Sequence, residues 1–159
     1  MKAPMTNAIR VLQKAGVSYE LMSYKYEEHG GTRVSAKELG VDEHAVVKTL
    51  IFQTDSSPSI PFVVLMHGDK EVSEKEMARI LGVKGVKPCA PKDADKFSGY
   101  HVGGTSPFGT RRKMKVYAAA TIFDLPTIYI NAGSRGLLFK MNPLDMERIL
   151  EAERVEATQ

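Results

Sequence analysis

The 159-residue sequence contains one cysteine, Cys89, and no tryptophan. A single cysteine excludes an intramolecular disulfide and any metal site built from several thiolates. Its VKPCAP context favours a small, partly buried side chain over a catalytic nucleophile. The longest apolar runs, such as IPFVVLM at 60–66, are far too short to span a bilayer. Because residues 1–16 also lack the apolar core of a signal peptide, we expect a cytoplasmic protein that does not contact membranes.

The common nucleotide-binding motifs are absent as well. The glycines of 104–109 have the spacing of a Walker loop, but Thr110-Arg111 follows where the motif requires lysine and then serine or threonine. A dinucleotide-binding fingerprint fails too, because two of the glycines are adjacent and Pro107 interrupts the run. The glycine-rich segment 99–109 therefore needs another explanation.

Metal sites and serine nucleophiles find no support either. None of the four histidines has the spacing of a zinc-binding helix motif, and no cysteine cluster accompanies them. Ser106 lacks the G-x-S-x-G context of a nucleophile elbow. We therefore expect neither a metal ion nor any other cofactor.

The chain is mildly basic, with a net charge of +3 and a pI of about 8.9. This balance permits a nucleic-acid partner without requiring one. Eight of the 22 basic residues lie within positions 84–115. Such a group is usually a solvated face, but around a pocket it would also suit a polyanion lying across the entrance.

The pattern of apolar residues and capping signals predicts one α/β domain over residues 1–159. It contains about six or seven strands, with helices at both ends and between strands. Because the order is not a regular βαβ alternation, we expect a mixed, curled sheet rather than a doubly wound one. The expected strands are 17–26, 46–52, 60–66, 83–88, 115–120, 126–132 and 136–141. The expected helices follow Thr6, Ser35, Asp42, Ser73 and Ala90, and a C-terminal helix covers 143–157.

Adjacent glycines give segment 99–109 a possible chemical use. Without a Cβ at Gly103 and Gly104, the backbone can approach a ligand closely, and its N–H groups can bind an oxyanion or a carbonyl oxygen. Pro107 would stiffen the loop. A tight turn that needs positive φ angles is an equally good interpretation of the same glycines.

Two more features have both a structural and a functional interpretation. Lys48 shares a strand face with apolar neighbours, so its stem either lies along the sheet rim or reaches into a cavity, where it could hold a phosphate, carboxylate or carbonyl oxygen. Segment 130–137 (INAGSRGL) is either a hairpin turn with an exposed arginine or a second loop facing the same space as 99–109.

Three spaced motifs together resemble the YbaK family. These are V-x-K-T-L around Lys48, G-Y-x-x-G-G-x-S-P-x-G at 99–109 and T-I-Y-x-x-x-G-x-R-G at 127–136, in this order and at these separations. The family comprises freestanding trans-editing deacylases related to the insertion domain of bacterial prolyl-tRNA synthetase. The resemblance covers roughly residues 6–150 and implies a mixed, strongly curved, barrel-like sheet with flanking helices and a central pocket.

The resemblance also implies an activity, hydrolysis of the ester in a mischarged aminoacyl-tRNA. The best-known members clear cysteine from the proline tRNA, which is needed because a synthetase pocket cannot fully reject similar small side chains. The implied partners are the acceptor end of a mischarged tRNA and prolyl-tRNA synthetase. Two alternatives stay open: a non-catalytic module that binds aminoacyl-adenosine or tRNA, and the same chemistry on another small amino acid such as alanine.

The implied site residues follow from the motifs. Lys48 corresponds to the family's essential lysine, and Gly103 and Gly104 to the glycines whose backbone faces the scissile ester. The implied substrate contacts are Tyr24, Thr105, Ser106, Pro107, Asn131, Gly133 and Arg135. In cysteine-specific members serine commonly stands at the position of Asn131, and histidine often at that of Tyr26. These departures concern the amino acid removed rather than the type of reaction.

Overall fold

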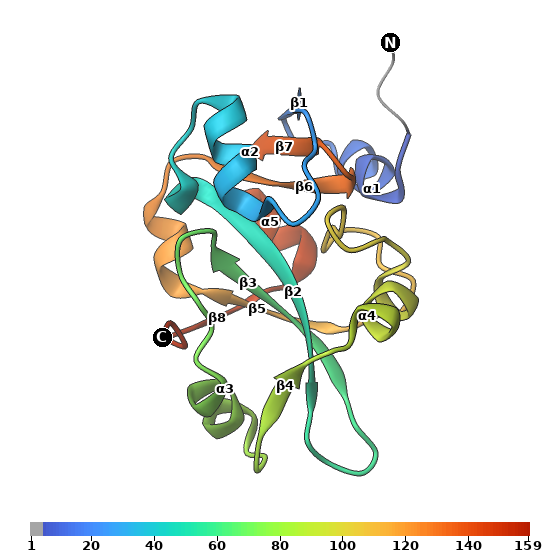
Figure 1. Ribbon diagram of the computed structural model, residues 1–159, viewed down its shortest axis with the longest axis vertical. Coiled ribbons are helices and arrows are strands. Elements are labelled where there is room, and N and C mark those ends of the chain that lie inside the picture. The colour runs from blue at the N-terminus through green and yellow to red at the C-terminus, as the bar shows by residue number, and fades with distance from the viewer. Residues whose placement is uncertain (1–4) are drawn as a thin grey trace.

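The computed structural model describes residues 5–159 (Figure 1). The helices are α1 (Asn7–Ala15), α2 (Gly31–Leu39), α3 (Glu74–Leu81), α4 (Pro91–Ser98) and α5 (Pro143–Leu150), with short 3-10 turns η1 (Glu43–Ala45) and η2 (Ala120–Asp124). The strands are β1 (Tyr19–Ser23), β2 (Val46–Thr54), β3 (Pro61–His67), β4 (Val86–Pro88), β5 (Lys115–Ala119), β6 (Ile128–Ser134), β7 (Leu137–Met141) and β8 (Glu153–Val155). Within the described part of the chain, no helix has the length and apolar character needed to cross a membrane.

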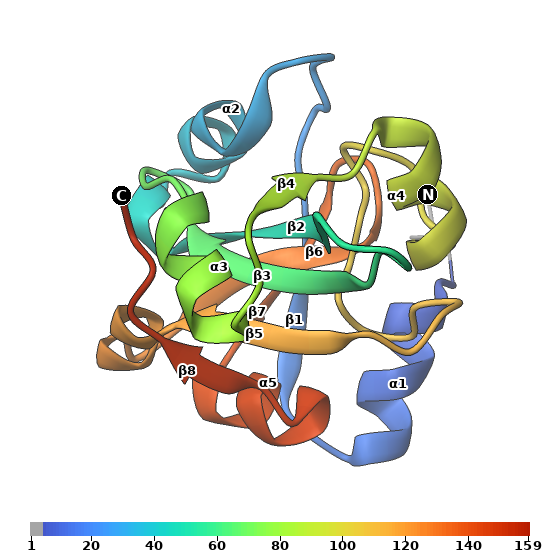
Figure 2. The same ribbon diagram turned by 90° about the horizontal axis from the view of Figure 1, so that it is seen from below.

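All the strands belong to one mixed sheet. Their order is β1-β7-β6-β2-β3-β5-β8, and β4 pairs with β2. The β2–β6, β3–β5 and β5–β8 pairs are parallel, and the others are antiparallel. This confirms the predicted mixed α/β sheet, and β2 and β3, which follow each other in the chain, form an antiparallel hairpin. Seen from below, α2 and α4 lie on one side of β2, and α1 and α5 lie on the other (Figure 2).

Side-chain capping fixes where three of the helices begin. Thr6 Oγ1 accepts a hydrogen bond from the Ile9 N–H at 3.1 Å, and Ser73 Oγ accepts one from the Glu76 N–H at 3.2 Å. The Asn142 side chain likewise accepts from the N–H of Leu144. Each bond satisfies one of the N–H groups that the first turn of a helix leaves unpaired. The predicted starts of α1, α3 and α5 are therefore confirmed.

Two predicted helices are wrong at their ends. The C-terminal helix stops at Leu150, Glu151 takes a left-handed φ of 51°, and β8 then pairs with β5, which gives one strand more than expected. Strand pairing and burial of Val155 outweigh the helix propensity of this charged segment. Helix α2 begins at Gly31 rather than after Ser35. The buried Ser35 hydroxyl instead donates to the Thr32 carbonyl one turn earlier.

One edge of β2 is left open in the middle of the sheet. On that edge β6 pairs only with Val46 and Val47, and β4 pairs only from Phe52 to Thr54. Among the described residues, positions 48–50 therefore have no strand partner on this side. The gap lies on β2, the strand that carries Lys48, and it makes room for a ligand beside that side chain.

Candidate active site

A cavity of about 580 Å³ lies against this open edge of β2. Its walls come from β2, the segment before α2 and α2 itself, the β3–α3 loop, the β4–α4 connection, the loop after α4 and the β6–β7 turn. The volume is in the usual range of small-ligand sites. The cavity brings together six of the ten residues that the motifs implied: Tyr24, Lys48, Gly103, Thr105, Asn131 and Arg135.

The other four implied residues, Gly104, Ser106, Pro107 and Gly133, are not among the residues that line the cavity. Ser106 and Pro107 are buried behind the loop, where the Ser106 hydroxyl accepts a hydrogen bond from the Phe108 N–H at 3.3 Å. Gly133 faces away: a Cβ added there would lie 2.7 Å from a ring carbon of Tyr100. The contacts that the structure shows for these three residues are internal ones, which hold the loops in shape.

Gly104 is the fourth of these residues, and its N–H is already in use. It donates to the His101 carbonyl at 2.8 Å. A Cβ on Gly104 would lie 2.7 Å from the backbone nitrogen of Arg135, so the missing side chain lets the two loops touch. Gly103 differs, because it lines the cavity with φ of 93° and its N–H has no hydrogen-bond partner within residues 5–159. The available backbone donor is therefore at Gly103.

Asn131 braces the two loops against each other. Its amide nitrogen donates to the carbonyls of Gly103 and Ser134, each at 3.3 Å. Its side-chain oxygen accepts from the N–H groups of Gly133, at 2.6 Å, and Ser134, at 3.2 Å. Because both ends of the amide are engaged within the protein, Asn131 positions Gly103 rather than offering a vacant group to a ligand.

Arg135 and Tyr26 complete this brace at the cavity wall. Arg135 Nε donates to the Val102 carbonyl at 3.0 Å, and the guanidinium lies 5.2 Å from the centre of the Tyr26 ring, a cation–π distance. A Cβ on Gly103 would overlap the Tyr26 ring. The loop at 102–104 is thus held by backbone and side-chain contacts from two other segments.

Lys48 reaches into the cavity and pairs there with a residue that the sequence did not single out. Its Nζ lies 3.2 Å from Oε1 of Glu71, in the loop between β3 and α3. The Lys48 side chain is 19% exposed and that of Glu71 is 77% exposed. Nothing in the local sequence GDKEVS separates Glu71 from an ordinary solvated charge, so only the fold identifies it.

Two further cavity residues stay in their neutral forms. Burial raises the pKa of the Cys89 thiol, and its sulfur donates to the Gln53 side-chain oxygen at 3.4 Å, so it is a poor nucleophile at neutral pH. The predicted partly buried position of Cys89 is confirmed. Burial also raises the pKa of Tyr24, whose phenol therefore keeps its proton and can donate a hydrogen bond into the cavity.

Tyr100, within the glycine-rich motif, links the two ends of the 99–109 loop through a buried hydrogen bond. Its hydroxyl donates to the Phe108 carbonyl at 2.5 Å, and burial raises the pKa of this hydroxyl to about 12.

We expect Tyr100→Phe to lower the free energy of unfolding by about 1–3 kcal/mol, because the buried Phe108 carbonyl loses its hydrogen-bond partner. Urea unfolding measures this change, with Tyr19→Phe as the matched control, since no hydrogen bond holds the Tyr19 hydroxyl among the described residues. Equal stability of the two variants would contradict the assigned role.

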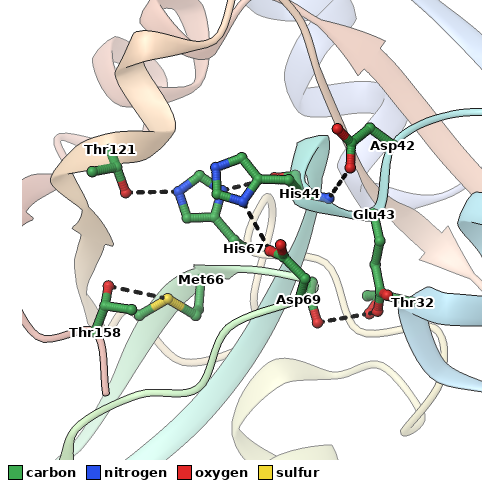
Figure 3. A network of polar contacts seen from close by, with 10 residues as sticks. Thr32, Asp42, Glu43, His44, Met66, His67, Asp69, Thr121 and Thr158 are labelled. Atoms are coloured by element: carbon green, nitrogen blue, oxygen red, sulfur yellow. Dashed lines mark hydrogen bonds and ion pairs between the residues drawn. The ribbon is translucent and has the colours of Figure 1, made fainter.

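A second polar cluster gathers around His44 of η1 and His67, the last residue of β3 (Figure 3). The rings of His44 and His67 stack 3.7 Å apart at 7°, and His44 Nδ1 lies 2.9 Å from an Asp69 oxygen. His67 uses both nitrogens, on the His44 carbonyl and on the Thr121 hydroxyl, each at 2.7 Å. Although the three side chains are close enough to hold a metal ion, a metal must lie in the plane of each imidazole ligand. Two parallel stacked rings share no such position, so the cluster in this geometry is a structural brace.

This cluster predicts a pH-dependent stability. Burial lowers the pKa of His67 below its usual value near 6.5. His67 therefore binds a proton more readily in the unfolded chain than in the folded one. Its contribution to the free energy of unfolding is complete above about pH 6.5 and is lost as the pH falls from there toward the folded-state pKa. Urea unfolding at pH 7.5 and 5.5 should show the decline in wild type and a smaller decline in His67→Gln. His29→Gln, at an exposed histidine, is the control and should decline like wild type. An unchanged decline in His67→Gln would rule out His67 as its source.

Comparison with known proteins assigns the chain. The model of the aminoacyl-tRNA editing domain matches residues 29–149. A protein from Enterococcus faecalis named "Putative Cys-tRNA(Pro)/Cys-tRNA(Cys) deacylase EbsC" is 28% identical over 154 residues, covering 96% of this chain and 93% of that protein. A proline–tRNA ligase from Levilactobacillus brevis is 30% identical over 97 residues, which are 61% of this chain and 16% of the ligase.

A solved structure confirms the fold that the motifs implied. The crystal structure of a "putative trans-editing enzyme for prolyl tRNA synthetase" superimposes with a TM-score of 0.85 at 17% identity, covering 99% of both chains. The mixed sheet, the flanking helices and the family match over most of the chain thus agree with one another. The chain belongs to the aminoacyl-tRNA editing domain family.

Proposed function

We propose that this protein hydrolyses the ester of mischarged aminoacyl-tRNA, with Cys-tRNA(Pro) as its main substrate. The observation that carries the proposal is that Lys48 and the Gly103 loop, 55 positions apart in the sequence, line one cavity of ligand size. Membership of the editing domain family and the name of the Enterococcus faecalis relative support the same reaction.

In the proposed mechanism, Lys48 binds the terminal adenosine or its phosphate, and the Gly103 N–H faces the ester carbonyl. The carbonyl oxygen gains negative charge during attack, and a preorganised N–H donor stabilises that charge. Removal of one such donor costs about 100- to 1,000-fold in rate in other hydrolases. Asn131 and Arg135 fix the carbonyl groups on either side of this N–H, which keeps the donor in place.

The nucleophile comes from the substrate or from water. Among the cavity residues, Cys89 stays protonated, and no serine or threonine there is bonded to a histidine base. Attack by the cysteine thiol of the substrate, or by a water that the ribose hydroxyls position, fits this lining. In either route the bond between the carbonyl carbon and the ribose oxygen breaks, and the ribose oxygen takes up the proton that the nucleophile releases. Attack by water gives free cysteine directly, whereas attack by the thiol gives a cyclic thioester that water then opens to cysteine.

The tRNA is proposed to lie over α4 and the loop that follows it. Helix α4 supplies Pro91 and Ala94 to the cavity, and exposed basic side chains lie on the same segment: Lys92, Lys96, Arg111, Arg112 and Lys113. Exposed cations on α4 and on the loop that follows it suit the phosphates of an acceptor stem.

Salt should therefore weaken the reaction through binding. Raising the salt from 50 to 200 mM should increase the KM for mischarged tRNA severalfold and leave kcat nearly unchanged, because phosphate contacts release counterions. Steady-state deacylation at several salt concentrations measures this dependence. Arg111→Gln should reduce the salt slope, while Lys140→Gln, on β7 outside the cavity lining, should keep the wild-type slope. A KM independent of salt would contradict tRNA binding on this face.

A panel of mischarged tRNAs tests the proposed function. Purified protein is incubated with Cys-tRNA(Pro), Ala-tRNA(Pro) and Pro-tRNA(Pro), with and without prolyl-tRNA synthetase, and the remaining aminoacyl-tRNA is followed with time. We expect the fastest loss for the cysteine ester and little for the proline ester. Faster loss of the alanine ester would move the specificity to alanine. Binding of all three without turnover would favour the non-catalytic module.

A further inference from the structure

An ion pair at the cavity wall places opposite charges side by side. The Lys48 ammonium and the Glu71 carboxylate lie 3.2 Å apart, and both side chains line the cavity. Only Oε1 of Glu71 contacts Lys48, and no other hydrogen bond to the Glu71 side chain occurs among residues 5–159. The carboxylate therefore keeps acceptor capacity for a second, positively charged donor.

The segment that carries Glu71 is held firmly from the far end of the chain. The Gln159 N–H donates to the Glu71 carbonyl at 2.9 Å, Val72 forms an isolated bridge with Thr158, and the Ser73 N–H donates to the Ala157 carbonyl at 2.6 Å. Figure 1 shows the C-terminus beside the β3–α3 loop. This anchoring gives the exposed carboxylate a fixed backbone position beside Lys48.

The ligand of the proposed reaction carries a matching charge. An aminoacyl ester has a free α-ammonium group one carbon from the scissile carbonyl, whereas a peptidyl or N-acylated ester has a neutral amide there. We propose that Glu71 accepts a hydrogen bond from this α-ammonium, so that the site selects unblocked aminoacyl esters and rejects N-acylated ones. This inference rests on the proposed function and adds a residue that determines its substrate class.

Glu71 fits this task better than the other carboxylates of the cavity. Glu28 faces His29 at 3.7 Å, and neither Glu27 nor Glu74 lies within ion-pair distance of Lys48. Glu71 alone among them is fixed next to the lysine that is proposed to hold the terminal nucleotide. An α-ammonium is close to that nucleotide in the substrate, because both are attached to the same ester.

Paired substrates test the inference. Cys-tRNA(Pro) and its N-acetylated form are given to wild type, Glu71→Gln and Glu74→Gln, and the kcat/KM ratio of free to N-acetylated ester is compared. We expect wild type to prefer the free ester by about tenfold or more, the effect of one hydrogen bond between charged groups. Glu71→Gln should bring the ratio close to one by slowing the free ester. Glu74→Gln removes the same charge from the same cavity and should keep the wild-type ratio.

The outcomes separate this inference from the proposed function. Equal wild-type turnover of both esters would overturn the inference and leave the deacylase intact. Equal slowing of both esters by Glu71→Gln would also overturn it, because the carboxylate would then only orient Lys48. Absence of wild-type turnover on either ester would contradict the proposed function, and the inference with it.

Discussion

Lys48→Ala is expected to lower kcat/KM for deacylation of Cys-tRNA(Pro) by about 100-fold or more. A rate loss of this size is typical when a substrate is no longer held in the reactive position. Among residues 5–159, Lys48 is the one lysine that lines the cavity, and its replacement leaves the Gly103 loop and the contacts that hold it untouched. Stability should change little, since the ion pair to the largely exposed Glu71 is a surface-type interaction of about 0–1 kcal/mol. Steady-state deacylation and urea unfolding of the same preparation measure the two effects.

The control for this substitution is Lys140→Ala, which removes an equal charge from β7 at a position outside the cavity lining. It should retain wild-type activity. If Lys48 holds the substrate mainly in the ground state, KM rises; if its contact strengthens in the transition state, kcat falls. Full activity of a folded Lys48→Ala protein would refute the role assigned to the residue.

Gly104→Ala is expected to lower the rate of deacylation by about 100-fold, because the added Cβ pushes the neighbouring 134–135 loop out of place. Its added Cβ would lie 2.7 Å from the Arg135 nitrogen and 2.9 Å from the Ser134 carbonyl carbon. Both are backbone atoms, so the two loops must separate, and the Gly103 donor moves with them. Overpacking of this kind also costs about 1–3 kcal/mol of stability. Single-turnover deacylation and urea unfolding measure the losses.

Gly85→Ala is the matched control, because its added Cβ would meet only Asp55 side-chain atoms at 3.7 Å or more, which is ordinary contact. It should keep wild-type activity and nearly wild-type stability. A Gly104→Ala protein that deacylates like wild type would show that close contact of the two loops is not required.

Local signals in the sequence were sufficient for much of the fold. Thr6, Ser73 and Asn142 could be recognised as helix caps because each cap bond closes within three residues. The β2–β3 hairpin could be predicted because its strands are adjacent in the chain. Lys48 and the loop at 99–109 were found through the spacing of the family's motifs. This spacing identifies the residues but does not show that they lie close together in the fold.

The remaining features depend on contacts between distant segments. Glu71 became visible only when the fold placed it beside Lys48, and β8 formed because β5 offered an edge to a segment with good helix propensity. Motif spacing could not tell that the Gly104 N–H donates to the His101 carbonyl, while the Gly103 N–H has no partner in the part of the chain that the structure describes. Hydrogen-bond pairing inside a loop follows from its three-dimensional path, so a run of glycines alone does not reveal it.

A single-turnover time course of the purified protein on Cys-tRNA(Pro) tests the central claim most directly. With protein in excess, free cysteine and intact tRNA should appear well above the rate of spontaneous ester hydrolysis, and Lys48→Ala should return the rate toward the spontaneous one. Release at the spontaneous rate by wild-type protein that binds the tRNA would contradict the account.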